Sequence, residues 1–513
     1  MSTTAPKTSP SPPAPTAALT PIRPESFGYA QARHLLWRAG FGGTPDQIQL
    51  LVEWGPERAV EHLVDRKNAP AQPVEADRFS SSIIGSPDAE TRARYRRARQ
   101  TSDEEALARL RLERQRRQSQ DRKQIRQMQQ WWLTRLIETP RPLEEKMTLF
   151  WHGHFATSYR TIEDSYHMFV QNQLYRSHAL GNYGSLMHRI IRDPAMIAYL
   201  DNNDSRKNSP NENLAREIME LFSLGVGNYT ENDIKEGARA LTGYTFEDDR
   251  FVFRQQNHDG GAKRILGRTD NMDGDDFVET ILAQQACSQY MCNKFYRFFA
   301  ADLPEGSEPD RETAAVLRDL ARLFRRSNYE VAPVLKKLFL SEHFYSPSVV
   351  NQRIKSPAEL VVGAIRSLHT PARDLSVLLD AMSLMGQNLL FPPSVAGWDG
   401  ERSWINTSTM YVRQNIMTYL LTGKTPRGYD AMADEQRYSA ESVLSQLTAS
   451  DPTALKDNSR VIDYLLRFTL GQAPAHARKT LREFVNANGG EVTNDIITGL
   501  LLLITAMPEY QLT

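Results

Sequence analysis

The chain has 513 residues but only two cysteines, Cys287 and Cys292, and no excess of charge of either sign. Two cysteines cannot build a disulfide framework, and no CxxC pair is present for zinc or redox chemistry. Lys and Arg number 62, as do Asp and Glu, so the formal net charge is zero. A neutral chain has no overall field that holds it on phosphate or anionic lipid, which makes nucleic acid a poor default partner.

Long hydrophobic runs are also missing. The longest apolar stretch near the C-terminus, Ile496 to Met507, is too short and interrupted to span about 30 Å of hydrocarbon. We therefore expect no membrane span. Met1 to Pro24 is rich in Pro, Thr, Ser and Ala and lacks the basic start and apolar stretch of a signal peptide. We expect residues 1–25 to form a disordered tail and, by default, a cytoplasmic location.

Several catalytic sequence templates are absent. The chain contains no HExxH, no GxSxG, no Walker A loop and no GxGxxG after a strand. It also lacks the repeated Glu-x-x-His of di-metal carboxylate bundles. These absences remove support for the standard zincin, hydrolase-fold, nucleotide-cleaving and dinucleotide-binding classes.

The composition is that of a globular protein, with 40% hydrophobic and 24% charged residues. Helical periodicity dominates, so we predict a mainly α, large multi-helix globular protein with one domain over residues 26–513. The stretch TFEDDRFVFRQQNHDGGAKRILG departs from this pattern, because short aromatic and β-branched segments flank DD and DGG turns. It predicts a small β-hairpin excursion near residues 244–267.

The clearest predicted helix runs from Ser209 to Phe222. Ser209 is its expected N-cap, Pro210 its first residue, and Glu212 is mainly a capping-box partner. Thr230, with Asp233 three residues later, predicts the start of the next helix.

One stripe of this helix is polar. At 100° per residue, the side chains that share the stripe are Asn213, Arg216, Glu217 and Glu220. Two carboxylates beside a guanidinium suit metal ligation or acid/base catalysis, with Arg216, Glu217 and Glu220 as catalytic candidates and Asn211 and Asn213 as supporting residues. The same stripe is also typical of any solvated helix face.

Two histidines, His152 and His154, stand two residues apart in FWHGHFATS. On an extended chain this spacing places both imidazoles on one side, and Gly153 favours a local exit from helix. Two imidazoles on one side are a common start of a metal site. The alternative is a buried pair satisfied by backbone carbonyls.

Two further pairs could reach the same site. His258 and Asp259 precede two glycines at a predicted turn, where they are candidate metal ligands; alternatively, Asp259 only shapes the turn. His34 and Arg38 lie one helical turn apart and are candidate supporting residues, although a capping or surface role for His34 is the more common one.

An Arg- and Glu-rich segment covers about residues 90–130 and contains few large apolar residues. It predicts a long, exposed, solvated helix. Such a segment could bind an acidic protein partner or RNA, but the neutral total charge and the lack of interleaved aromatics favour the solvated helix and argue against RNA.

Taken together, the motifs resemble one known family. They are HLLWRAGFG, PLEEKMTLFWHGHFATS, PNENLAREIMELFSLGVGNYTENDIKEGARALTGYTF, HDGGAKRILG, IKSPAELVVGAIRSL and PPSVAGWDGERSW, in that order. Over nearly the whole chain they are similar to the bacterial domain of unknown function 1800 family. This resemblance implies a mainly helical bacterial protein without an assigned activity, whose relatives are often exported. It supplies no proven catalytic residues.

Two functional hypotheses follow. The first is a metal-dependent enzyme, hydrolytic or oxidative, in which His152, His154, Glu217 or Glu220, and His258 or Asp259 bind one or two divalent transition-metal ions. The second is a non-enzymatic binding or assembly protein, in which the same polar groups form a structural network. The first requires that the imidazoles and the acidic stripe meet in one accessible cavity.

Overall fold

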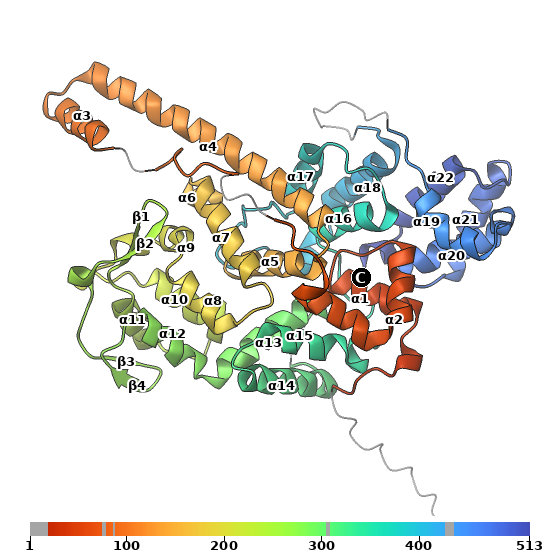
Figure 1. Cartoon of the computed structure of the whole chain (residues 1–513), viewed down its shortest axis with the longest axis horizontal. Coiled ribbons are helices and arrows are strands. Elements are labelled where there is room, and N and C mark those ends of the chain that lie inside the picture. The colour runs from red at the N-terminus through yellow and green to blue at the C-terminus, as the bar shows by residue number, and fades with distance from the viewer. Residues whose placement is uncertain (1–18, 74–77, 86–87, 304–307, 426–435) are drawn as a thin grey trace, which may run out of the picture.

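The computed structural model describes residues 19–73, 78–85, 88–303, 308–425 and 436–513 (Figure 1). Within these ranges the chain is mainly helical and its strands form only two small sheets, which confirms the predicted class. None of the helices in the described ranges combines the length and the hydropathy that crossing a membrane requires. Buried hydrophobic side chains from Leu19 to Tyr510 form one contiguous cluster.

The N-terminal helices are α1 (Tyr29–Arg38) and α2 (Pro45–Val64). Before them, Leu19 and Ile22 are buried, and the Ile22 amide donates to the Leu340 carbonyl at 2.7 Å. The predicted boundary of the tail at residue 25 is therefore too late, because these two apolar side chains join the core. The rest of the predicted tail, residues 1–18, lies outside the described residues.

The Arg-rich segment forms an arm that projects from the body, made of α3 (Ala89–Gln100) and α4 (Glu104–Glu138) (Figure 1). The prediction of one long helix over this segment is wrong, because the chain forms two helices. Ser102 has a left-handed backbone with φ of 51°, and Asp103 caps α4 by accepting from the Ala106 amide at 3.0 Å. From Asp121 onward α4 enters the core.

Five helices follow along the chain: α5 (Pro142–His154), α6 (Tyr159–Ile162), α7 (Ser165–Ser177), α8 (Tyr183–Ile190) and α9 (Pro194–Tyr199). The next, α10 (Asn213–Met219), continues as one π-helical segment, Glu220–Leu224. The predicted cap at Ser209 is wrong. Ser209 instead pairs with Arg206 in an isolated bridge, and the Asn211 side chain accepts from the Asn213 amide at 2.9 Å where the helix begins.

The predicted hairpin is real but is followed by a second one. After α11 (Glu231–Ala240), which starts at Thr230 as predicted, β1 (Tyr244–Glu247) pairs antiparallel with β2 (Arg250–Phe253) across the DD turn. The DGG sequence does not form a hairpin turn. Instead β3 (Lys263–Ile265) and β4 (Arg268–Asp270) pair around Leu266 and Gly267, both of which have positive φ.

The remaining helices complete the body, with the last four at the end opposite the sheets (Figure 1). They are α12 (Gly274–Leu282), α13 (Gln285–Phe299), α14 (Arg311–Arg326), α15 (Val331–Phe339), α16 (Pro357–Leu368), α17 (Leu375–Leu384), α18 (Thr407–Thr422), α19 (Glu441–Ser450), α20 (Asn458–Leu470), α21 (Ala475–Ala487) and α22 (Asn494–Thr505). Short 3-10 turns lie at Pro24–Ser26, Arg66–Asn68, Asn202–Asp204, Gln255–Asn257, Glu342–Tyr345, Glu401–Trp404, Ala454–Lys456 and Pro508–Gln511.

Candidate metal centre

His152 and His154 lie on helix α5, not on an extended strand as predicted. On a helix, side chains two residues apart point about 200° away from each other. Gly153 is instead a point of close approach, because a Cβ on Gly397 would lie 2.2 Å from the Gly153 carbonyl oxygen. The two imidazoles therefore face different neighbours.

Both histidines are enclosed by aromatic side chains. The His152 ring lies 5.5 Å from the rings of Trp132 and Trp398, and its Nε2 has no hydrogen-bond partner among the described residues. The His154 ring stacks on Phe150, and its Nε2 lies 3.0 Å from the Phe222 carbonyl oxygen. Burial lowers the pKa of each histidine to about 3, so both rings are neutral at neutral pH.

The polar side chains predicted on α10 include two, Arg216 and Glu220, that pair with nearby residues of the chain. Arg216 donates to Glu231 at 2.8 and 2.9 Å and to Glu212 at 3.2 Å. Glu220 accepts from the Tyr229 hydroxyl. Glu217 is half-buried, and its pKa is raised by burial and by the Glu220 carboxylate.

Of the two predicted histidines, His154 contacts the π-helical continuation of α10, through the Phe222 ring at 5.9 Å between centroids and through the Phe222 carbonyl. His154 meets the carbonyl of Phe222 in the π-helical segment, and the Tyr183 hydroxyl donates to the same oxygen at 2.6 Å. Asn211, whose amide group donates to the Asp201 carbonyl at 3.0 Å, and Asn213 belong to the start of α10. These contacts hold α5 against α10 and create no ligand set.

The remaining predicted residues are also used locally. His258 Nδ1 lies 2.9 Å from the Thr242 carbonyl oxygen, and Asp259 accepts from Arg239 at 2.7 and 3.1 Å. The Arg239 guanidinium lowers the pKa of Asp259 to about 2. Together these contacts fasten the loop between the two hairpins to α11.

His34 and Arg38, the predicted supporting residues on α1, contact other parts of the chain. His34 packs against Phe344, with 4.8 Å between ring centroids, and burial holds its pKa well below the usual range. Arg38 donates to the carbonyl oxygens of Val349 at 2.9 Å and Thr513 at 2.6 Å.

A different set of side chains comes together as a possible metal site. Among the described residues, the one group of three or more His, Cys, Asp or Glu with ligand atoms within 4.8 Å of one another is Asp164, His167 and Asp249. None of the sequence-predicted ligands belongs to it. His167 Nε2 lies 3.8 Å from Asp164 Oδ2 and 3.4 Å from Asp249 Oδ1.

Two local structures position this group. Asp164 is the N-cap of α7, and its Oδ1 accepts from the Tyr166 amide at 3.0 Å and the His167 amide at 3.1 Å, which leaves Oδ2 to face the imidazole. Asp249 projects from the turn between β1 and β2. The His167 ring packs edge-on against Phe246 of β1, with 5.2 Å between centroids.

The electrostatic surroundings of the group are acidic. Burial, with the nearby Asp164 and Asp248 carboxylates, raises the pKa of Asp249. His167 Nε2 also lies 3.0 Å from the Asp248 carbonyl oxygen, while Nδ1 is buried with no hydrogen-bond partner among the described residues. The imidazole is 6% exposed and Asp249 28%, so the group is reached from solvent on the hairpin side.

The sequence carried two weak signals for this centre that our prediction did not use. Asp164 and His167 form an Asp-x-x-His at a helix start, and Asp249 lies in the DD turn that was correctly predicted. No short sequence pattern indicates that His167 and Asp249, which are 82 positions apart in the sequence, are close in space.

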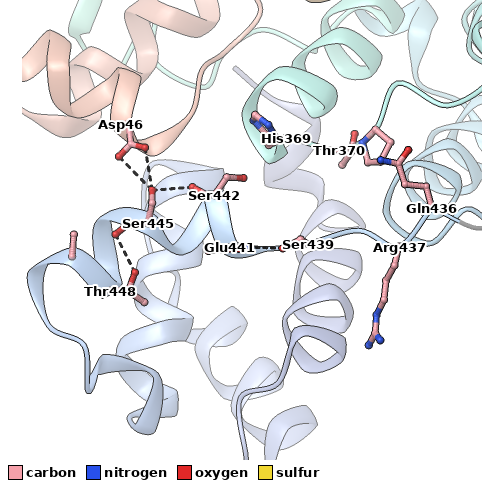
Figure 2. A pocket seen from close by; sticks show the side chains of 12 residues that line it. Asp46, His369, Thr370, Gln436, Arg437, Ser439, Glu441, Ser442, Ser445 and Thr448 are labelled. Carbon is pink, nitrogen blue, oxygen red and sulfur yellow. Dashed lines mark hydrogen bonds between the residues drawn. The ribbon is translucent and has the colours of Figure 1, made fainter.

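A separate cleft of about 950 Å³ lies between α2, the end of α16 and α19 (Figure 2). Its lining includes Asp46, His369 and Ser445, and Asp46 accepts from the Ser445 hydroxyl at 3.1 Å. None of the predicted site residues lines it. The cleft offers hydroxyl groups and two carboxylates, of which Asp46 already accepts hydrogen bonds from Ser445 and Gln446.

A family model described as protein of unknown function (DUF1800) matches residues 34–512. No curated protein and no solved structure shows a significant match to the chain. Because the family match covers nearly the whole chain and the helical architecture fits the family motifs, the resemblance found in the sequence is confirmed. The chain belongs to the DUF1800 family.

Proposed function

We propose that this protein is a metal-dependent enzyme whose divalent ion is held by Asp164, His167 and Asp249. The observation that supports the proposal is the spacing of the three ligand atoms. Ligands about 2.1 Å from a tetrahedral ion stand about 3.4 Å apart. His167 Nε2 and Asp249 Oδ1 have this separation, and Asp164 Oδ2 is 3.8 Å from the same nitrogen.

The ligand types favour hydrolytic over oxidative chemistry. Two carboxylates and one imidazole suit Zn²⁺ or Mn²⁺. Three protein ligands leave an open position, and an ion in such a site supplies Lewis-acid activation of a bound water. Asp249, the most exposed of the three, faces the side from which a substrate would approach.

The alternative to a metal site is a set of ion pairs, in which His167 binds Asp164 and Asp249 directly and serves only to stabilise the fold. An imidazolium at His167 between two carboxylates would fasten the hairpin to α7 without any metal. Ion binding requires the lone pair of Nε2 instead, and so moves the remaining ring proton to Nδ1. The metal site and the ion-pair arrangement therefore predict different effects of the same substitutions on metal binding.

The test uses metal-depleted full-length protein equilibrated with Zn²⁺ or Mn²⁺, with bound metal measured by elemental analysis. We expect one ion per chain in the wild type, and in Asp164→Asn an affinity lower by about tenfold or more. Asn also serves as an N-cap, so α7 is preserved in this variant. Hydrolysis of bis-p-nitrophenyl phosphate, with and without added metal, is the activity readout.

His188→Gln is the matched control. His188 also lies between two carboxylates, with Nδ1 2.7 Å from Asp275 and Nε2 3.0 Å from Glu279. Its acids are on opposite ring nitrogens and so cannot share one ion with it. Metal binding unchanged in His188→Gln but lost in Asp164→Asn supports the centre. Absence of bound metal in the wild type, or equal binding in Asp164→Asn/Asp249→Asn, overturns it.

As a second function we propose protein binding through residues 89–123, here called the basic arm. The specific observation is charge asymmetry: the basic arm has twelve Arg and Lys residues against six Asp and Glu, although the whole chain is neutral. Eleven of the twelve cations are exposed. Replacing Arg109, Arg116 and Lys123 with Gln should weaken association with an acidic partner and make it less sensitive to salt.

A further inference from the structure

One face of α4 carries a regular stripe of side chains that nothing in the described structure covers. Arg109, Leu112, Arg116 and Lys123 follow one another at helical spacings of three, four and seven residues, and therefore lie on one side of the helix. All four are exposed, and Leu112 has 48% of its surface accessible. We call these four residues the outer stripe.

The outer stripe faces away from α3. Leu110, two positions before Leu112, is buried, as is Ala98 of α3. On a helix these two leucines differ by about 200° in direction. Leu110 therefore closes the contact between the two helices of the basic arm, while Leu112 is presented to solvent between two arginines.

An exposed leucine flanked by basic residues on one helix face offers an apolar contact and charge pairs to a partner helix. Spacings of three and four residues allow continuous contact along a partner helix, with apolar contact at the centre and charge pairs at the edges. A guanidinium pairs with a carboxylate through two parallel hydrogen bonds, which adds geometric selectivity. Arg109 already donates one hydrogen bond to the Glu105 carboxylate one turn earlier.

The composition of the arm favours a carboxylate partner over a phosphate polymer. Glu90, Glu104, Glu105 and Glu113 are exposed among the arginines and would repel a polyphosphate that ran along the arm. Tyr95 is the only aromatic residue in the basic arm and is half-buried, so bases have no stacking surface there. A folded partner that touches only the outer stripe needs no base-stacking surface, and of these carboxylates it meets Glu105, which is already paired with Arg109.

We propose that the outer stripe is the docking surface for an acidic amphipathic helix of a partner protein. This inference rests on the second proposed function and specifies its partner and its face. Carboxylates of the partner helix pair with Arg109, Arg116 and Lys123, and an apolar side chain of the partner covers Leu112.

The test uses the full-length protein and a synthetic helical peptide with a leucine seam flanked by glutamates. A scrambled peptide of the same composition and a short DNA duplex are compared at about 150 mM NaCl. We expect the helical peptide to bind more tightly than either comparison. Arg109→Glu/Arg116→Glu should raise its Kd by about tenfold or more, and Leu112→Ser by about fivefold.

Arg94→Glu/Arg97→Glu, on α3, is the control with the same change of net charge. Its peptide Kd should stay within about twofold of the wild type, apart from a small loss in electrostatic steering. Equal losses in both double variants overturn the outer stripe but leave binding by the basic arm in place. Equal binding of the scrambled peptide, or tighter binding of DNA, overturns the acidic-helix partner. No peptide binding by the wild type overturns the inference without testing the metal centre.

Discussion

Lys146 and Glu359 form an ion pair inside the protein, with 2.8 Å between Lys146 Nζ and Glu359 Oε1. The pair joins α5 to α16, and neither side chain has more than 2% of its surface exposed. Glu359 also lies 3.5 Å from the Arg353 guanidinium. Glu359 is thus the counter-charge of Lys146, and it shares Arg353 with Asp302, whose Oδ1 lies 4.0 Å from the guanidinium.

We predict that Glu359→Gln lowers the free energy of unfolding by about 3–5 kcal/mol, because it leaves the buried Lys146 ammonium without its counter-charge. Urea denaturation at neutral pH measures the change. Glu61→Gln is the control, since its pair with Lys336 is exposed and is worth about 1 kcal/mol or less. A similar, small effect of both substitutions would show that Glu359 is not needed as this counter-charge.

His152→Phe should reduce the acid sensitivity of the fold. The unfolded chain protonates His152 below about pH 6.5, whereas the folded protein does so only near its depressed pKa of about 3. In this window the unfolded state binds more protons, so the wild type loses about 1.4 kcal/mol per pH unit through this residue as the pH falls. Between pH 7.5 and 5 the variant should gain about 2 kcal/mol relative to wild type. The free energy of unfolding of both proteins is measured by guanidinium titration at each pH. The same pH dependence in wild type and His152→Phe would contradict a neutral, buried His152.

Gly363→Ala should destabilise the packing of α16 against α1. A Cβ at this position would lie 2.4 Å from Trp37 Cζ3 and 2.5 Å from Cη2, so the indole must shift. Overpacking of this kind costs about 1–3 kcal/mol and lowers the temperature of thermal unfolding. Gly260→Ala, where no described atom lies within 4 Å of the added Cβ, should leave that temperature nearly unchanged.

The two cysteines should not react with thiol reagents in the folded protein. Both are buried, and burial raises the pKa of Cys287 to about 12 and also raises that of Cys292. At pH 8 the thiolate population is therefore negligible. Ellman's reagent should detect two thiols in guanidinium chloride and none in native buffer. Fast labelling of the native protein would mean that α13 opens readily.

Local sequence patterns predicted the elements that depend on neighbouring residues. The mainly α class, the cap at Thr230 and the hairpin around Asp248 and Asp249 all depend on short-range geometry. The cap at Ser209 was predicted by the same kind of rule and was wrong. The helix begins later, with Glu212 at the N-cap position and the Asn211 side chain accepting from the Asn213 amide, and Ser209 pairs with Arg206.

The candidate site was much less predictable, because it depends on contacts between distant segments. His152 and His154 were placed on an extended segment, whereas aromatic packing around both rings accompanies a helix that continues through His154. Asp164 and His167 reach Asp249 only because the first hairpin folds over the start of α7. No periodicity or spacing contains that information.

The single helix α4 runs from the basic arm to the neighbourhood of the candidate metal centre. Its 35 residues form one helix of about 52 Å, with no break between the exposed turns and the core. Midway along it, Asp121 accepts from the Ser165 amide at 3.1 Å, and Ser165 directly follows Asp164. The helix that carries the outer stripe therefore also carries the carboxylate that binds the first residue of α7, next to the candidate ligand Asp164.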